Sequence, residues 1–283
     1  VGSDSLIDII SYHNYGAVPE ERVYAATELW QVINKYNPNI ELWQGECGYP
    51  SHSSTRDFRG RAPWGLNIQA KWLLRQSFVD IYFCKATLSN YFKLVHPRGK
   101  GEQPIRTNLR PIDKIFGYPE RGGSRVKTVG VNEKCLLTNP TFEPKPAFYA
   151  YQNLCAVWQP GYKPNKPEYK IDIVDEGVFY GISEDDAFPS VPLVAAFTDN
   201  DGNNLVAWWL PWNAQENLAE LATVNITLKN LNFTHPVMVD LLSGYVYDVG
   251  DIFTNLNNDC VIKNISLADY PFLLVEKASL KIQ

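Results

Sequence analysis

The chain has 283 residues, of which 45% are hydrophobic, 13% aromatic and 20% charged, and its formal net charge at pH 7 is −5. This composition excludes a chain that is disordered throughout, and the lack of a long Lys and Arg run argues against a nucleic-acid-binding protein. No apolar run approaches the ~18 residues of a membrane span, and the opening VGSDSLIDII lacks the regions of a signal peptide. The only methionine is Met238, so we expect a processed or truncated product.

The first part of the chain, residues 1–158, alternates apolar runs with helical patterns, which is typical of βαβ units and a parallel sheet. Residues 6–11 predict a first strand, which ends in the cluster Tyr12-His13-Asn14-Tyr15. A helix follows, with Pro19 at its first position and an end near Asn37, because the next residue is a proline.

Two further strand and helix pairs follow. Residues 40–46 predict the second strand, which Cys47-Gly48-Tyr49-Pro50 ends. An almost wholly apolar pattern from about Gly65 to Lys85 predicts a long helix that is buried on all sides. The last pair consists of a strand over residues 88–95, a Gly- and Pro-rich segment from His96 to about Thr128, and a helix that begins near Pro146.

The second part of the chain, residues 159–283, has little helical periodicity. It begins with the linker-like sequence PGYKPNKPEYK, after which short β-branched and aromatic runs alternate with turn signals such as Ser243-Gly244. Seven or eight strands at this spacing predict an all-β sandwich. Trp208, Trp209 and Trp212 lie on one of these runs, and we expect them in the core and at the domain interface.

Several local sequences carry a resemblance. ELWQGECGYPS resembles the seventh-strand motif of retaining glycoside hydrolases with a (β/α)8 barrel, and SYHNYG is similar to the end of the sixth strand of that clan. EPKPAFYAYQNL, DLLSGYVYDV and LADYPFLLVEK resemble the eighth helix and the appended β-sandwich of β-xylosidase and α-L-iduronidase relatives. The resemblance implies an α/β plus all-β fold: the last three units of a TIM barrel (residues 1–158), then a β-sandwich (residues 159–283).

For Glu46 the resemblance implies the role of catalytic nucleophile. A physical argument points the same way, because TIM-barrel active sites lie at the carboxyl ends of the strands and Glu46 is followed at once by the turn residues Gly48 and Pro50. A retaining enzyme needs an ionised carboxylate below the anomeric carbon and a second carboxyl group ~5–5.5 Å away. The competing interpretation of Glu46 is an ordinary solvated glutamate at a strand end.

The other candidate residues would bind the substrate. His13 would hydrogen-bond the nucleophile or a sugar hydroxyl, and the alternative is a satisfied histidine at a strand end. Flat aromatic rings on the loops at the barrel mouth could stack on sugar rings, with core packing as the competing account. Arg56 lies in a basic loop that suits an anionic sugar, unless that loop is only a solvated surface. The aromatic candidates are Tyr12, Tyr15, Tyr49 and Trp64.

Neither a cofactor nor a metal is expected, since the five cysteines are scattered and form no C-x-x-C, although one disulfide remains possible. The acid/base glutamate of this clan follows an Asn at the end of the fourth strand, and no such pair precedes the first strand here. Asn132-Glu133 lies in the long insertion between the third predicted strand and the last helix, and it is a poor candidate. We therefore expect two partners, a carbohydrate substrate and the first five βα units, supplied as upstream residues or as a separate chain.

Two alternatives stay open. The first is a non-catalytic carbohydrate-binding or interaction protein on a degenerate barrel scaffold. The second is an unrelated α/β hydrolase with a serine or cysteine nucleophile, which has little support because the sequence contains no G-x-S-x-G and Cys47 lacks an evident histidine base.

Overall fold

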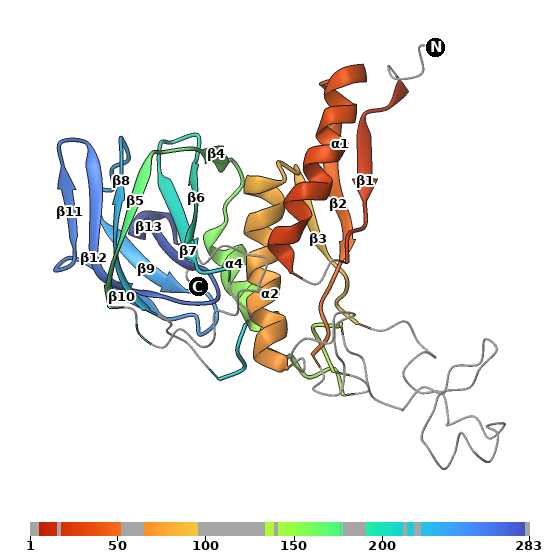
Figure 1. The fold of residues 1–283 in the computed structure, drawn as a ribbon. Coiled ribbons are helices and arrows are strands. Elements are labelled where there is room, and N and C mark those ends of the chain that lie inside the picture. The colour runs from red at the N-terminus through yellow and green to blue at the C-terminus, as the bar shows by residue number, and fades with distance from the viewer. Residues whose placement is uncertain are drawn as a thin grey trace.

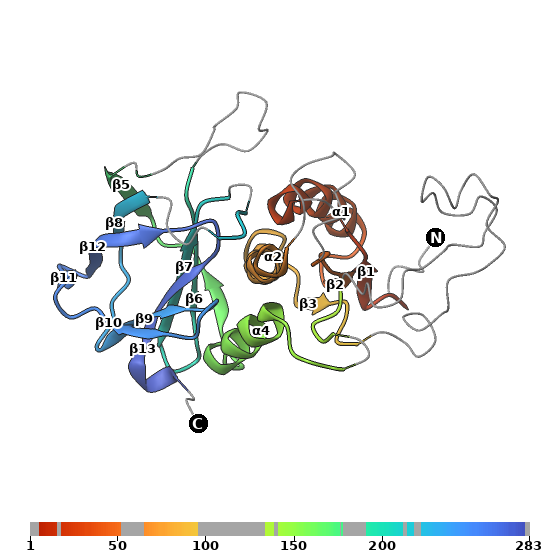
Figure 2. The same cartoon turned by 90° about the horizontal axis from the view of Figure 1, so that it is seen from below.

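The computed structural model describes residues 6–15, 18–51, 65–95, 134–138, 141–175, 177, 191–211, 214–217 and 222–280. Two parts are visible in Figure 1: a small parallel sheet with helices, coloured red to green, and a larger region of antiparallel strands, coloured green to blue. The helices α2 and α4 lie between the parallel sheet and the antiparallel strands (Figures 1 and 2).

The parallel sheet has the strand order β1-β2-β3, with β1 at Ile9–Tyr12, β2 at Glu41–Cys47 and β3 at Leu88–Tyr91. The predicted strands and helices are all present, but the third strand is shorter than the predicted range of 88–95. Several α/β folds contain three parallel strands of this kind, so the barrel stays a prediction. The helices are η2 (Pro19–Glu21), α1 (Arg22–Tyr36), α2 (Leu66–Phe78), the π-helix η3 (Val79–Phe83) and α4 (Pro146–Val157).

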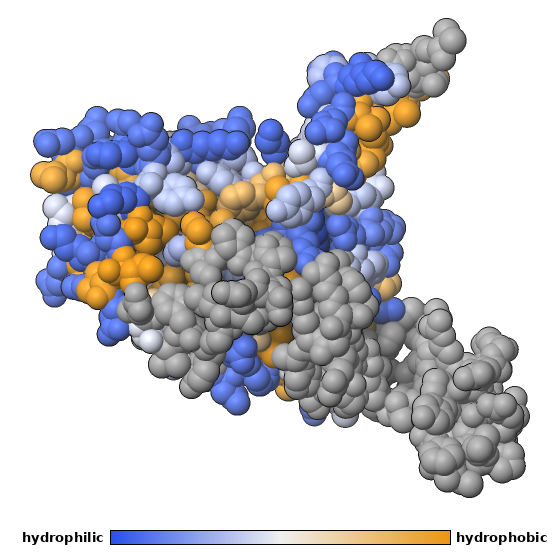
Figure 3. Space-filling model, in the orientation of Figure 1, coloured by the Kyte–Doolittle hydropathy of each residue, from blue (hydrophilic) through white to orange (hydrophobic). Residues whose placement is uncertain are grey.

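The helices cover one face of the parallel sheet. Along β1, Ile10 and Tyr12 pack against the main core, whereas Ile9 and Ser11 alternate with them and are exposed. In the part of the chain that the structure describes, no helix covers this second face, and Ile9 is 39% exposed on it. Figure 3 shows hydrophobic colour at the place where Figure 1 draws β1.

The prediction that the long helix is buried is confirmed, but its sequence is less apolar than we expected. Ten of its residues from Ile68 to Phe78 are buried, and four of these are polar or charged. A buried charge is tolerated only when it is paired, so these side chains must find partners in the surrounding elements. The four residues are Gln69, Lys71, Arg75 and Gln76.

The antiparallel strands form a six-stranded sheet with the order β10-β9-β13-β7-β6-β4 and a four-stranded sheet with the order β11-β12-β8-β5. In β8 every second residue is buried, as one face packs inward. The bounds are β4 (Lys163–Asn165), β5 (Tyr169–Asp175), β6 (Leu193–Thr198), β7 (Asn204–Trp209), β8 (Ala222–Leu228), β9 (Pro236–Asp240), β10 (Val246–Asp248), β11 (Phe253–Leu256), β12 (Asp259–Leu267), β13 (Phe272–Glu276) and the 3-10 turn η4 (Lys277–Ser279).

The strand β7 is buried on both faces because it lies between the four-stranded sheet and the helices. Trp208 stacks on Phe272 and donates to the carbonyl of Ser266 at 3.0 Å, inside the antiparallel part. Trp209 points the other way and lies 6.1 Å from Phe78 of α2, centroid to centroid. The prediction that these two tryptophans serve the core and the interface is confirmed, whereas Trp212 lies outside the described residues.

Two further expectations concern covalent links and membranes. All five cysteines lie in the described part, and each is a free thiol, so the possible disulfide does not form. Among the described residues, no helix combines the length and the apolar composition that crossing a membrane requires.

Candidate functional site

Glu46 reaches its position through a β-bulge. The register pairs Gln44 with Ser89 and Cys47 with Tyr91, so β2 has one more residue than β3 between these two pairs. Gln44 and Cys47 are both buried, and Gly45 and Glu46 stand between them where regular alternation would allow one residue. A bulge of this kind redirects a side chain, and here it leaves the Glu46 carboxylate half-buried at the carboxyl end of the strand.

Two predicted residues from the neighbouring strand end meet this carboxylate. The Tyr15 hydroxyl donates a hydrogen bond to Glu46 Oε1. His13 Nδ1 lies 3.6 Å from Glu46 Oε2, with the His13 side chain 53% exposed and the Glu46 side chain 32% exposed. Both residues directly follow β1, which pairs with β2 in parallel, so the carboxyl ends of the two strands bring the three side chains together.

The protonation of Tyr15 suits a hydrogen-bond donor. Burial and the bond to the Glu46 carboxylate both raise the pKa of Tyr15 above its ordinary value, so its hydroxyl keeps its proton at neutral pH. Lys134 adds a positive charge over the face of the ring, with Nζ 3.9 Å from the ring centroid of Tyr15. We did not predict Lys134 as a site residue, and its only signal was the excess of basic residues in the segment 98–134.

Gly45 allows β1 and β2 to approach each other beside the site. A Cβ atom added at Gly45 would collide with Ser11 Oγ and would lie 3.0 Å from His13 Nε2. The carbonyl of Gly45 accepts a hydrogen bond from Asn90 Nδ2 at 2.7 Å, so β3 is tied to the bulge as well. Gly45 thus leaves the space that His13 needs beside Glu46.

Tyr49 is not at the mouth, and the prediction that it stacks on a sugar is wrong. Its side chain is 2% exposed, and its ring meets Trp72 edge-on with centroids 5.2 Å apart. The buried Arg22 guanidinium donates to the Tyr49 hydroxyl and to the Cys47 thiol, and it lies 3.4 Å from Asp80 Oδ1. Tyr49 follows the strand but turns inward, because this buried cation needs polar partners beneath the site.

Tyr12 also departs from its predicted role. Its side chain packs against the main core on the helix-covered face of β1, and its hydroxyl is buried. This burial, together with the nearby Asp80 carboxyl, raises the pKa of Tyr12. The structure therefore supports the competing account for Tyr12, in which its ring packs against the core. Trp64, Arg56 and Asn132-Glu133 lie outside the described residues.

The described residues contain no group of three or more His, Cys, Asp or Glu side chains that could hold a metal ion. The chain matches no model of a protein family, and no curated protein matches it either. The case for a function therefore depends on the geometry around Glu46 and on the local sequences that led to it.

Proposed function

We propose that the chain is the C-terminal part of a retaining glycoside hydrolase, with Glu46 as nucleophile and the acid/base glutamate outside this chain. The observation that carries the proposal is the Glu46 carboxylate, which is 32% exposed, with Tyr15 bound to Oε1 and His13 beside Oε2. A nucleophile in this reaction must be both accessible and fixed in orientation. Two partners from the adjacent strand meet the second requirement.

The chemistry assigns a role to each group. Glu46 Oε2 would attack the anomeric carbon while the glycosidic bond to the leaving oxygen breaks and that oxygen takes a proton from the acid/base residue. Water, deprotonated by the same residue, would then attack the glycosyl ester and release the Glu46 carboxylate. Tyr15 would hold Oε1 throughout by donating its hydrogen bond. His13, which is more exposed, could also reach a sugar hydroxyl.

The proposal includes a partner that completes the barrel, namely the first five βα units. Within the described residues, β1 and β3 are the outer strands of the sheet, and parallel sheets are normally covered on both faces. Leu6, which precedes β1, is 81% exposed, and Ile9 at the start of β1 is 39% exposed. A cavity of about 220 Å³ lies between β3, α2 and α4, and its apolar lining would receive side chains of a neighbouring strand. This lining includes Ile81, Leu88, Leu154 and Trp158.

The test is covalent labelling of the native protein, with the polypeptide that completes the barrel present. We would use 2,4-dinitrophenyl 2-deoxy-2-fluoroglycosides of several sugars, because this leaving group departs without acid and the reaction reports on the nucleophile alone. We expect release of one dinitrophenolate per chain and an adduct of one fluorosugar on the peptide that contains Glu46. Glu46→Gln should remain unlabelled with an unchanged circular dichroism spectrum, whereas Glu41→Gln, an exposed glutamate at the other end of β2, should label normally.

The outcomes separate the two functions. An adduct on another residue would overturn the assignment of Glu46. Failure of every sugar in the panel to form an adduct would favour the non-catalytic carbohydrate-binding or interaction protein on the same scaffold.

Tyr15 provides a second, independent prediction. Tyr15→Phe removes the hydrogen bond to Glu46 Oε1 but keeps the ring. A hydrogen bond to a charged group contributes roughly 1.5–3 kcal/mol, so we expect the rate of adduct formation to fall about 10- to 100-fold. Dinitrophenolate absorbance would measure that rate, and an unchanged rate would remove Tyr15 from the site.

A further inference from the structure

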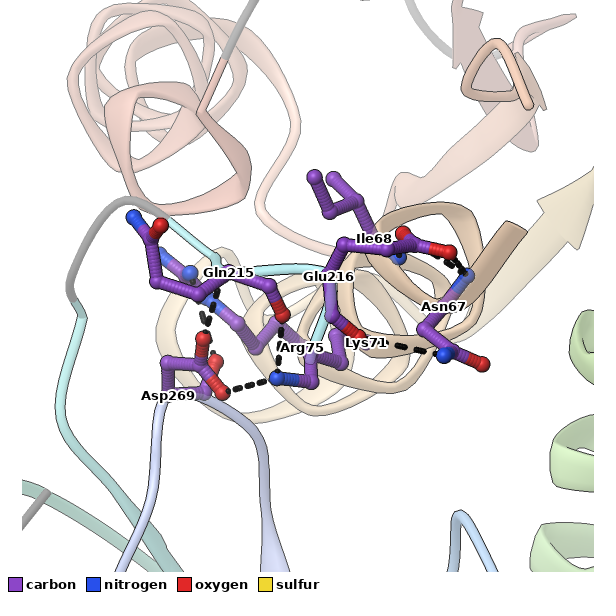
Figure 4. A network of polar contacts seen from close by, with 7 residues as sticks. All are labelled: Asn67, Ile68, Lys71, Arg75, Gln215, Glu216 and Asp269. Atoms are coloured by element: carbon purple, nitrogen blue, oxygen red, sulfur yellow. Dashed lines mark hydrogen bonds and ion pairs between the residues drawn. The ribbon is translucent and has the colours of Figure 1, made fainter. Parts of the chain in front are cut away.

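The first turn of α2 is held by a side chain from the antiparallel part of the chain (Figure 4). The residue before the helix is Gly65, which has no side chain to cap the free backbone N–H groups. Glu216, which is 149 residues away from Asn67 in sequence, supplies the cap instead. Its carboxylate accepts from the backbone N–H of Asn67 at 3.1 Å and of Ile68 at 3.1 Å, and its carbonyl accepts from Asn67 Nδ2 at 3.1 Å.

The next turn of the helix is bound to the same segment. The buried Lys71 ammonium donates to the carbonyl of Gln215 at 2.6 Å and lies 2.8 Å from Asp269 Oδ1. Asp269 in turn accepts from the backbone N–H of Gln215 at 2.6 Å. Figure 4 shows that residues 215 and 216 lie along the helix, with Asp269 closing the network from the turn that precedes β13.

The segment 214–217 also shares a hydrophobic core with two residues that follow Glu46, Cys47 and Tyr49. Ala214 belongs to a small core, separate from the main one, that is packed against the Glu46 partner Tyr15. In the same layer, Gln69 Nε2 donates to the carbonyl of Tyr49 at 2.8 Å and to the Tyr91 hydroxyl at 3.1 Å. This small core consists of Val18, Cys47, Tyr49, Ile68, Trp72 and Ala214.

We propose that Glu216 is a positioning residue for the Glu46 site, which makes the antiparallel part of the chain a component of that site. The cap holds the first turn of α2 through the Asn67 and Ile68 N–H groups. In that turn Gln69 donates to the carbonyl of Tyr49, and Ile68 belongs to the same small core as Cys47 and Tyr49, so the turn holds the segment that follows Glu46. The catalytic consequence rests on the proposed function, whereas the mechanical connection between Glu216 and Tyr49 does not.

Hydrogen exchange of the whole protein, read by mass spectrometry, tests the connection without any substrate. For Glu216→Ala we expect at least tenfold faster exchange in the peptides that cover residues 66–72 and 47–51, with β8 and β12 unchanged. Glu216→Gln should give a smaller effect, because its amide oxygen can still accept from the helix. Glu28→Gln, which changes an exposed glutamate on α1, is the matched control and should leave both peptides unchanged.

Either of two exchange results would overturn the mechanical connection. Faster exchange confined to Asn67 and Ile68 would show a local cap with no influence on the site, and equal acceleration across the protein would show general destabilisation.

A second experiment measures labelling by the fluoroglycoside. Here Glu216→Ala should lower the maximal rate constant about tenfold and change the half-saturating concentration less than twofold. If wild-type protein forms no adduct but the exchange result holds, the proposed function fails and the connection stands. If adducts form normally in Glu216→Ala, its role in catalysis is contradicted.

Discussion

The side chains around Glu46 divide into those that local sequence could place and those it could not. Tyr15 and His13 follow one parallel strand and Glu46 ends the next, so strand topology alone predicts that they meet. Gly45 inside a strand was also a signal for a bulge. Tyr49 could not be placed, because its direction depends on Arg22, a buried cation that the sequence presents as an ordinary residue early in a helix.

The five cysteine thiols are expected to differ in how fast they react. Burial raises the pKa of Cys260 to about 12, and burial with the nearby Asp80 carboxyl raises that of Cys84 to about 12. Cys155 is the exposed one of the five. We expect an aromatic disulfide reagent at pH 8 to modify one thiol quickly in the folded protein and all five in guanidinium chloride.

Cys155→Ser supplies the control, because it should remove the fast phase completely. Two or more fast thiols in the wild-type protein would contradict the buried positions of the other four cysteines.

The helix α2 shows which features of an element a sequence pattern predicts and which it does not. Its length and burial were predictable, because a helical pattern without a solvated face belongs in a core. The partners of its buried charges could not be predicted, because they lie far away along the chain. Lys71 binds Asp269, and Arg75 binds both carboxylate oxygens of Glu20. The usual signal for a helix start is a polar residue directly before it, and here the cap is the distant Glu216.

Asp269→Ala tests how strongly α2 depends on such partners. The change leaves the buried Lys71 ammonium without its counter-charge and removes the acceptor for the Gln215 N–H. Breaking a buried ion pair typically lowers the free energy of unfolding by about 3–5 kcal/mol, and we expect a loss of this size in urea denaturation.

The exposed pair of Lys229 and Asp259 provides the comparison, and Asp259→Ala should change the denaturation midpoint far less. The double change Lys71→Met with Asp269→Leu should recover much of the lost stability, because no unpaired charge then remains. A single Asp269→Ala variant as stable as wild type would show that Lys71 finds another partner.

For the whole molecule, the predicted boundary near residue 158 does not separate two hydrophobic cores. One cluster of buried residues runs from Ala26 in α1 through Phe78 in α2 to Phe197 and Trp209 in the antiparallel sheet. Trp209 Nε1 also donates to Glu20 Oε1 at 2.9 Å across the junction. The composition change in the sequence was therefore a correct sign of different secondary structure, but it gave no information about this shared core.

A shared core predicts that the chain unfolds in one step. We expect far-ultraviolet circular dichroism, which reports on the helices, and tryptophan fluorescence, to which Trp209 at the junction contributes, to give coincident thermal transitions. Phe78→Ala, at the centre of the junction, should move both thermal transitions together to lower temperature. The expected loss in the free energy of unfolding is about 3–5 kcal/mol. Two separate transitions, or a change in one signal only, would contradict a single cooperative unit.

The network around Asp269 also has a consequence for the order of events on the ribosome. Arg75 meets the carbonyl of Asp269 across 194 residues of sequence, and Lys71 depends on the carboxylate of the same residue. A nascent chain leaves the ribosome with its N-terminus first, and N-terminal domains generally fold first during synthesis. Here α2 cannot bury its lysine in the finished position until the turn before β13 has left the exit tunnel. In a nascent chain that stalls before Asp269, the Lys71 ammonium therefore still lacks the Asp269 carboxylate, and Arg75 still lacks the Asp269 carbonyl.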